Sequence, residues 1–88
     1  MSLYKYPRTK FVGINSIEKQ IQHIKSEVIE AETAQSLENQ IMEICDIEHG
    51  AETALRILEE QLGIDVDWYR EQVRKKNDIR KYYGEESQ

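Results

Sequence analysis

Two pairs of acidic residues have the types and spacing that could support chemistry in this chain. Glu27 and Glu30 are three residues apart, as are Glu43 and Asp46, and twelve residues separate the pairs. On a helix, residues three apart share a face, with Cβ atoms about 5–6 Å apart. On neighbouring antiparallel helices the pairs would surround one point, where each close pair repels by roughly 3 kcal/mol at an effective dielectric near 20. Such a chain either spreads its carboxylates in water or gathers them on a cation.

The cation that suits this ligand set is a hard divalent ion. Mg²⁺ and Mn²⁺ favour carboxylate oxygens, and Mg²⁺ shares its shell with water and substrate phosphates. A single Glu-x-x-Glu pair occurs by chance in any acidic helical protein, whereas two pairs on consecutive helices are a stronger indication. Spacing alone leaves metal binding and a solvated acidic face both open.

A basic stretch late in the chain contrasts with the acidic remainder. Its members are Arg70, Arg74, Lys75, Lys76, Asn77, Arg80, Lys81, Tyr82 and Tyr83. Charge alone permits two interpretations: a face that is solvated or pairs with the acidic helices, or a set of cations that neutralises phosphate charge. The two tyrosines either stack on a base or anchor the end of the helix.

Helices must position these groups. The first is predicted to begin after an N-cap at Asn15, with Glu18 completing a capping box, and to end near residue 34. Its apolar residues follow the 4-3-4-3 spacing of a packed bundle seam, namely Ile17, Ile21, Ile24, Val28 and Ala31. Glu27 and Glu30 flank this seam and do not lie on the opposite, solvated face.

A second helix is predicted over residues 37–61, after a short break at 34–36 with Ser36 as its N-cap; one continuous helix is the alternative. Its seam comprises Leu37, Ile41, Ile44, Ala51, Leu55, Leu58 and Leu62. Glu48 interrupts this seam, and Gly50 costs about 1 kcal/mol relative to Ala in a helix interior. Because both irregularities lie within two turns of the second carboxylate pair, they favour a site there.

The end of the chain is predicted to form a third helix. Gly63 ends the second helix, and Asp65 or Asp67 caps a third that reaches to about Lys81. Residues 85–88 are predicted to form a flexible tail.

The start of the chain is predicted to form an extended N-terminal arm over residues 1–14. Pro7 opposes a helix and Gly13 marks a turn, while aromatic and basic side chains are interleaved between them. Such an arm either binds a phosphate or a base, or packs across the bundle or a partner subunit. The second interpretation is favoured.

Three further residues carry reactive side chains. Cys45 is predicted to be a small buried hydrophobe among isoleucines. His23 precedes Glu27 by one turn, and His49 follows Asp46 by three residues. A Glu together with a Glu-x-x-His triplet is the ligand pattern of di-iron bundles. Because the triplet here begins with Asp46 and the chain has no second one, we expect both histidines to be ordinary residues of a polar face.

The composition predicts one all-α domain whose core is shared between copies. With 88 residues, the chain is long enough for one domain with a marginal core. Long amphipathic segments with one Pro and four Gly indicate a bundle of long helices, three main helices per chain, completed by oligomerisation. The net charge of -5 disfavours a nucleic acid duplex as partner. No apolar run has the length of a membrane span or a signal peptide, so we expect a cytoplasmic location and no membrane partner.

The order and spacing of these motifs resemble those of the MazG-like all-α nucleoside triphosphate pyrophosphohydrolases. The motifs are Glu-x-x-Glu, then Glu-x-x-Asp, then Lys76-Asn77-x-x-Arg80-x-Tyr82-Tyr83. The resemblance runs from about Ile17 to Gly84, so residues 15–84 are interpreted as a MazG-like helical domain. It implies a homodimer or homotetramer that hydrolyses a (deoxy)nucleoside triphosphate to monophosphate and pyrophosphate.

The resemblance also implies roles for individual residues. Mg²⁺, with Mn²⁺ as the alternative, would be held by Glu27, Glu30, Glu43 and Asp46, and we assign Glu30 as the general base. The residues implied to contact the nucleotide are Lys76, Asn77, Arg80 and Tyr83. Ser26 stands where the family often has a further Glu. The alternative function is a non-catalytic helical interaction or nucleotide-binding module of the same fold.

Overall fold

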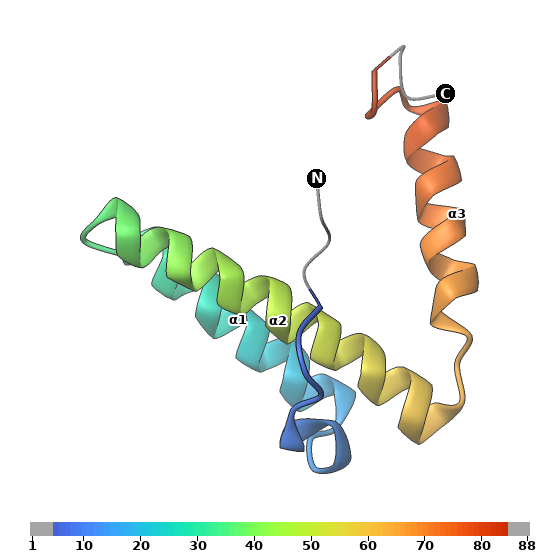
Figure 1. The fold of residues 1–88 in the computed structure, drawn as a ribbon, viewed down its shortest axis with the longest axis horizontal. Helices are drawn as coiled ribbons and strands as arrows, with labels where there is room; N and C mark the ends of the chain where they lie inside the picture. Colours follow the sequence, from blue (N-terminus) through green and yellow to red (C-terminus); the bar gives the residue numbers. More distant parts are fainter. Residues whose placement is uncertain (1–4, 85–88) are drawn as a thin grey trace.

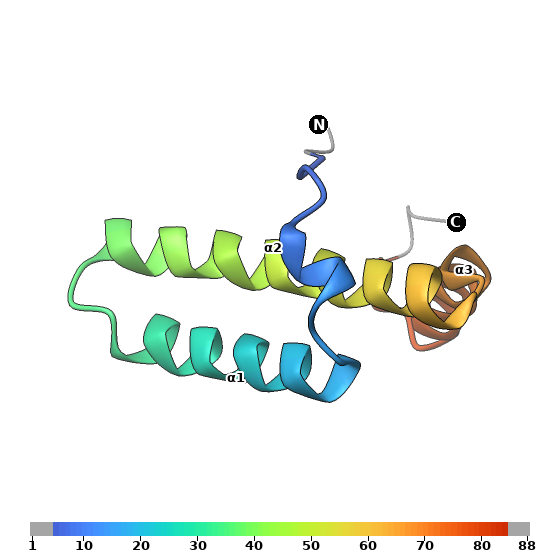
Figure 2. The ribbon, with the colours of Figure 1, turned by 90° about the horizontal axis from the view of Figure 1, so that it is seen from below.

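The computed structural model describes residues 5–84, which form helices and no strand. A short 3-10 helix, η1 (Lys10–Gly13), precedes three α-helices: α1 (Ile17–Thr33), α2 (Leu37–Leu62) and α3 (Val66–Ile79). Helices α1 and α2 lie antiparallel and side by side, and α3 turns away from the end of α2 (Figures 1 and 2). The predicted all-α class with three main helices is confirmed for this part of the chain. The predicted tail, and the first four residues of the arm, lie outside the described residues.

The break between the first two helices is confirmed, but the first N-cap was assigned to the wrong residue. Ser16, not Asn15, caps α1, because its side chain accepts a hydrogen bond from the Lys19 N–H at 3.1 Å. Asn15 is buried and its amide donates to Gln20 Oε1 at 2.9 Å. Ser36 caps α2 in the predicted way.

The later helix ends follow local sequence signals. Gly63 adopts a left-handed conformation with φ of 66° and its N–H caps α2, as predicted for a C′ glycine. Asp65 then caps α3 by accepting from the Trp68 N–H at 3.2 Å. The third helix ends at Ile79, slightly before the predicted Lys81, which itself has a positive φ of 61°.

The core of the single chain is small. Its buried apolar residues are Val12, Ala31, Ala54, Ile57 and Val66. The radius of gyration is 15.1 Å, against about 12 Å for a compact domain of this length. The accessible surface is 7224 Å², against about 5,400 Å² for a compact monomer of this mass. Within residues 5–84, no helix combines the length and apolar character needed to cross a membrane.

The face that α1 turns toward α2 differs from the predicted seam. Gln20 and Glu27 are buried there, whereas Ile21 stays 56% exposed. The Gln20 amide donates to the Gly50 carbonyl of α2 at 3.1 Å. This hydrogen bond holds the polar side of α1 against α2. Cys45 was predicted to be buried among isoleucines and is exposed, as are the neighbouring Ile41 and Ile44.

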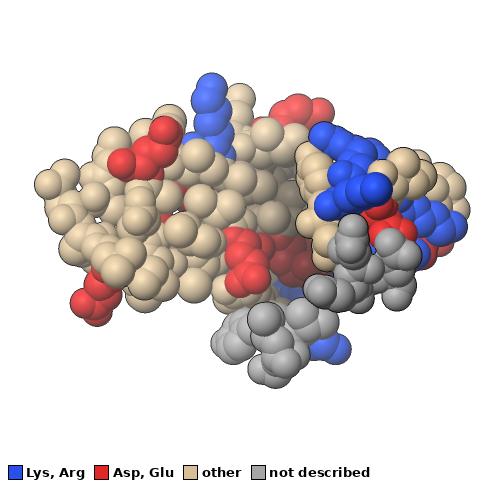
Figure 3. Space-filling model, turned by 90° about the horizontal axis from the view of Figure 1, so that it is seen from above, with Lys and Arg blue, Asp and Glu red and all other residues tan. Residues whose placement is uncertain are grey.

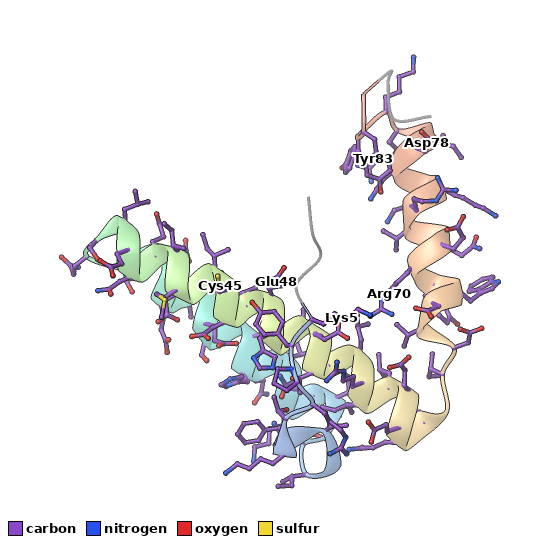
Figure 4. The ribbon with its side chains drawn as sticks, viewed as in Figure 1. Lys5, Cys45, Glu48, Arg70, Asp78 and Tyr83 are labelled. Atoms are coloured by element: carbon purple, nitrogen blue, oxygen red, sulfur yellow. The ribbon has the colours of Figure 1, made fainter. Side chains whose placement is uncertain are left out.

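The N-terminal arm packs across its own bundle, as the favoured interpretation predicted, although residues 10–13 form a 3-10 helix and are not extended. The Tyr6 hydroxyl donates to Glu48 Oε1 at 2.7 Å, and Arg8 makes a two-pronged contact with Glu60. Val12 of this arm is fully buried. Glu48 is labelled on α2 in Figure 4. Its place in the otherwise apolar seam is explained by its hydrogen bond with Tyr6 of the arm.

Candidate metal centre

The structure brings the two predicted carboxylate pairs together across the α1–α2 contact. The Glu43 carboxyl lies within hydrogen-bonding reach of Glu30, and this contact is the main reason that the pKa of Glu43 is raised. Partial burial and repulsion by Glu30, Asp46 and Glu27 raise it further. The four groups thus form one electrostatic cluster, although their binding of metal stays a prediction.

Glu27 is the most deeply placed member of the cluster. The residue is only 8% exposed, and burial is the main cause of its raised pKa. Repulsion by Asp46 and Glu30 adds to this effect, while the nearby His23 and His49 oppose it. A carboxylate in such surroundings favours either a proton or a cation as a neighbour.

Two oxygens of the cluster are buried without a hydrogen-bond partner. These atoms are Glu27 Oε1 and Glu43 Oε2, one from each helix. Buried polar atoms in folded proteins are nearly always hydrogen-bonded, and an unpaired one carries a desolvation cost. A bound cation would remove that cost for both oxygens.

Gly50 makes the placement of Glu27 sterically feasible. A Cβ atom at Gly50 would lie 2.8 Å from Glu27 Oε1 and 3.2 Å from Ile24 Cγ1. Gly50, although unfavourable in a helix interior, therefore lets the Glu27 carboxylate pack directly against the α2 backbone.

Gly50→Ala is expected to push the Glu27 carboxylate out of its buried position. The crowding costs about 1–3 kcal/mol, and the helix preference of Ala offsets about 1 kcal/mol of it, so the free energy of unfolding should fall by no more than about 2 kcal/mol. Because burial is the main cause of the raised Glu27 pKa, that pKa should fall toward its ordinary value. Carboxyl NMR titration measures this change.

Gly13→Ala is the matched control for this substitution. Its Cβ would meet only the Arg8 guanidinium, at 3.9 Å. It should therefore leave the pKa of Glu27 unchanged. A Glu27 pKa that is equally unchanged in Gly50→Ala would contradict the expected displacement.

The donor types of the cluster fit Mg²⁺ or Mn²⁺, which prefer carboxylate oxygens. Among residues 5–84, no three His, Cys, Asp or Glu side chains are already arranged around one point in a way that would hold an ion. The four carboxylates therefore have to draw closer to bind a metal, as expected for groups that repel each other in its absence. Ser26, at the position of the family's further Glu, instead donates to the His23 carbonyl of its own helix at 2.7 Å.

The predicted nucleotide-binding residues are not brought to the carboxylates within one chain. They lie at the far end of α3, where Tyr83 is labelled in Figure 4 and where Lys and Arg gather in Figure 3. Asn77 Nδ2 is 3.5 Å from the Tyr83 hydroxyl, and the Arg80 guanidinium lies over the Tyr82 ring at 4.5 Å. Lys76 is exposed on the last turn of the same helix. The two predicted halves of the site are thus separate in the single chain.

The expectation that both histidines are ordinary residues of a polar face stays a prediction, but the structure places them beside a cavity. A cavity of about 210 Å³ lies between the arm, α1 and α2, and both histidines line it. The full lining is Thr9, Phe11, Gln20, His23, Glu27, Asp46, His49, Gly50 and Thr53. The signal was present in the spacing of His23 to Glu27 and of His49 to Asp46, but the arm that closes the cavity could not be placed from sequence.

No family model matches this chain, and it matches neither a curated protein nor a solved structure. The resemblance to the MazG-like enzymes therefore rests on the motifs alone.

Proposed function

We propose that this protein is a Mg²⁺-dependent nucleotide pyrophosphohydrolase, with Mn²⁺ as the alternative ion. This hydrolase would convert a (deoxy)nucleoside triphosphate to monophosphate and pyrophosphate. The observation that carries the proposal is the meeting of two carboxylate pairs from α1 and α2, with one buried and unpartnered oxygen on each helix. An acidic chain needs a bridging cation to bind a triphosphate, and this cluster offers the ligands for one.

In the proposed reaction, Glu27, Glu30, Glu43 and Asp46 hold the metal. When bound, Mg²⁺ neutralises charge that develops on the phosphate oxygens. Glu30, like Asp46, is an exposed member of the cluster and so is accessible to solvent. It accepts a proton from water as general base while the water oxygen bonds to the α-phosphorus; the bond from that phosphorus to the α–β bridging oxygen breaks, and pyrophosphate leaves.

The proposed nucleotide contacts come from a second copy of the chain. Lys76, Asn77, Arg80 and Tyr83 neutralise or contact the part of the substrate that the metal does not cover. Because these residues lie far from the carboxylates of their own chain (Figure 1), they serve the carboxylates of a partner in a homodimer or homotetramer.

Surface area and charge support this assembly. Each chain exposes about 1,800 Å² more than a compact monomer, whereas a standard interface buries about 800 Å² per partner. Residues 17–62 contain eleven acidic and three basic side chains, while residues 66–84 contain six basic and three acidic ones. The basic α3 of one copy therefore complements the acidic α1–α2 pair of another.

The test is pyrophosphate release from a panel of ribo- and deoxyribonucleoside triphosphates with Mg²⁺ or Mn²⁺. We expect turnover that depends on the metal and that Glu43→Gln reduces at least tenfold. The absence of turnover with every substrate at high protein concentration would overturn the enzymatic proposal. If a nucleotide then still binds in a metal-dependent manner, the non-catalytic nucleotide-binding module becomes the better description, in agreement with Ser26 at the position of the further Glu.

A further inference from the structure

The cavity between the arm, α1 and α2 is lined by two histidines that the proposed hydrolysis does not use, beside two carboxylates of the cluster. We propose that it binds a divalent transition ion, such as Zn²⁺ or Co²⁺, through His23, Glu27, Asp46 and His49. This site adjoins the carboxylate cluster and shares Glu27 and Asp46 with it. It does not depend on the proposed nucleotide hydrolysis.

The spacing of these residues turns both ligand pairs toward one cavity. His23 and Glu27 are one turn apart on α1, and Asp46 and His49 are three residues apart on α2, so each pair shares a helix face. All four line the cavity. His23 Nε2 lies 3.6 Å from Glu27 Oε1, close to the roughly 3.4 Å that separates two ligand atoms of a tetrahedral zinc with bonds of about 2.0–2.1 Å.

Glu27 supplies the independent indication of a ligand. Its Oε1 atom is buried and makes no hydrogen bond, and the residue as a whole is more than nine-tenths buried. The side chain lines the cavity from α1 and is held against Gly50. An anionic oxygen in this position has no hydrogen-bond donor to compensate for its burial. A cation in the cavity would supply that compensation.

The imidazole of His49 is held by contacts with the arm. Its Nε2 lies 3.3 Å from the Pro7 carbonyl, and the Tyr6 ring stacks on the imidazole with centroids 4.2 Å apart. Histidine ligands usually donate their other ring N–H to a carbonyl or carboxylate, which fixes the tautomer. If Nε2 carries the proton that the Pro7 carbonyl accepts, Nδ1 is the nitrogen with a free lone pair. The arm thus orients His49.

The two imidazoles decide the class of ion. Imidazole nitrogen suits Zn²⁺, Co²⁺ and related ions, whereas Mg²⁺ prefers oxygen ligands alone. Because no three of these ligand side chains yet surround one point, at least two of the four have to shift within the cavity as the ion binds. Two histidines and two carboxylates then make up a four-ligand set.

The test is a titration of the full, metal-stripped chain with Co²⁺, followed by visible absorption, with Zn²⁺ as competitor. We expect one Co²⁺ per chain with the intense bands of tetrahedral nitrogen and oxygen coordination, displaced by Zn²⁺. His23→Gln, at an exposed position, should weaken Co²⁺ binding at least tenfold. His49→Gln should do the same, and its fold is checked separately because it also loses the Tyr6 stack.

Glu30→Gln separates this site from the proposed Mg²⁺ site. It should leave Co²⁺ affinity within about threefold of the unaltered chain while abolishing the Mg²⁺-linked rise in melting temperature, and His23→Gln should show the reverse pattern. Co²⁺ binding that is insensitive to His23→Gln, or that Glu30→Gln weakens as strongly, would assign the ion to the carboxylate cluster and overturn the proposal. No Co²⁺ binding by the unaltered chain would overturn it as well.

Discussion

Mg²⁺ is expected to raise the melting temperature of this protein strongly, and Glu43→Gln is expected to abolish the effect. A ligand that binds only the folded chain at 100 times its dissociation constant stabilises it by about 2.7 kcal/mol, or roughly 10–20 °C for a domain of this size. Glu43 sits at the centre of the mutual repulsion and carries a buried unpartnered oxygen. Its replacement by Gln therefore removes a charged ligand at little steric cost. Calorimetry with and without Mg²⁺ measures both effects.

The matched control is Glu38→Gln, an exposed carboxylate earlier on α2 that is not part of the cluster. It should keep the full response to Mg²⁺. In the absence of metal, Glu43→Gln should melt at a higher temperature than the unaltered chain near pH 7, because one repelled charge is gone. An unchanged Mg²⁺ response in Glu43→Gln would rule out its role as a ligand.

The pH dependence of the metal-free protein gives a further check with a definite sign. Glu27 and Glu43 have raised pKa values in the folded chain. Their stabilising contribution is therefore fully present below the ordinary glutamate pKa of about 4.3 and is lost as the pH rises through the folded values. The Glu60 and Glu71 pKa values are lowered by hydrogen bonds from Arg8 and Arg74, and these groups oppose the trend. Because both pairs are exposed, their effect is small.

The local structure of the helices could be predicted from sequence because its causes are local. Ser36, Gly63 and Asp65 each act within a few residues of the helix end that they set. Local N-cap preference does not distinguish Asn15 from Ser16, since both are good N-caps. The choice was decided by Gln20, which binds the Asn15 side chain and the α2 backbone together.

The meeting of the carboxylates could also be predicted, but the face that α1 turns toward α2 could not. Hydrophobic periodicity placed Ile21 inward, whereas the structure buries Gln20 and Glu27. A rule that places apolar residues inside fails at Gln20, whose amide binds the α2 backbone, and at Glu27, for which Gly50 leaves room. Likewise, the position of His49 depends on Pro7, which is 42 residues away in the chain.

The exposed apolar faces lead to the second large expected effect. Ile41→Glu is expected to convert the proposed oligomer into a monomer of 10.4 kDa. Ile41 is 51% exposed in the single chain, beside the exposed Ile44 of the same seam. Because only about half of Ile41 is left for a partner to cover, the lost apolar burial costs about 1 kcal/mol per copy. In a symmetric dimer two copies are altered, so the dissociation constant should rise at least about thirtyfold, and the cost of burying the Glu charge adds to this. Sedimentation velocity over a range of concentrations measures the mass.

Gln22→Glu is the control, because it adds the same charge at an exposed polar position of α1. It should leave the mass of the oligomer unchanged, whereas Ile41→Glu should also melt at a lower temperature, since its partner no longer covers the apolar seam. The proposed pyrophosphohydrolase activity should fall with the mass, because the carboxylates of one chain then lack the α3 residues of another. An unaltered chain that is monomeric at every concentration would refute the shared core, and activity that persists in the monomer would show that both halves of the site come from one chain.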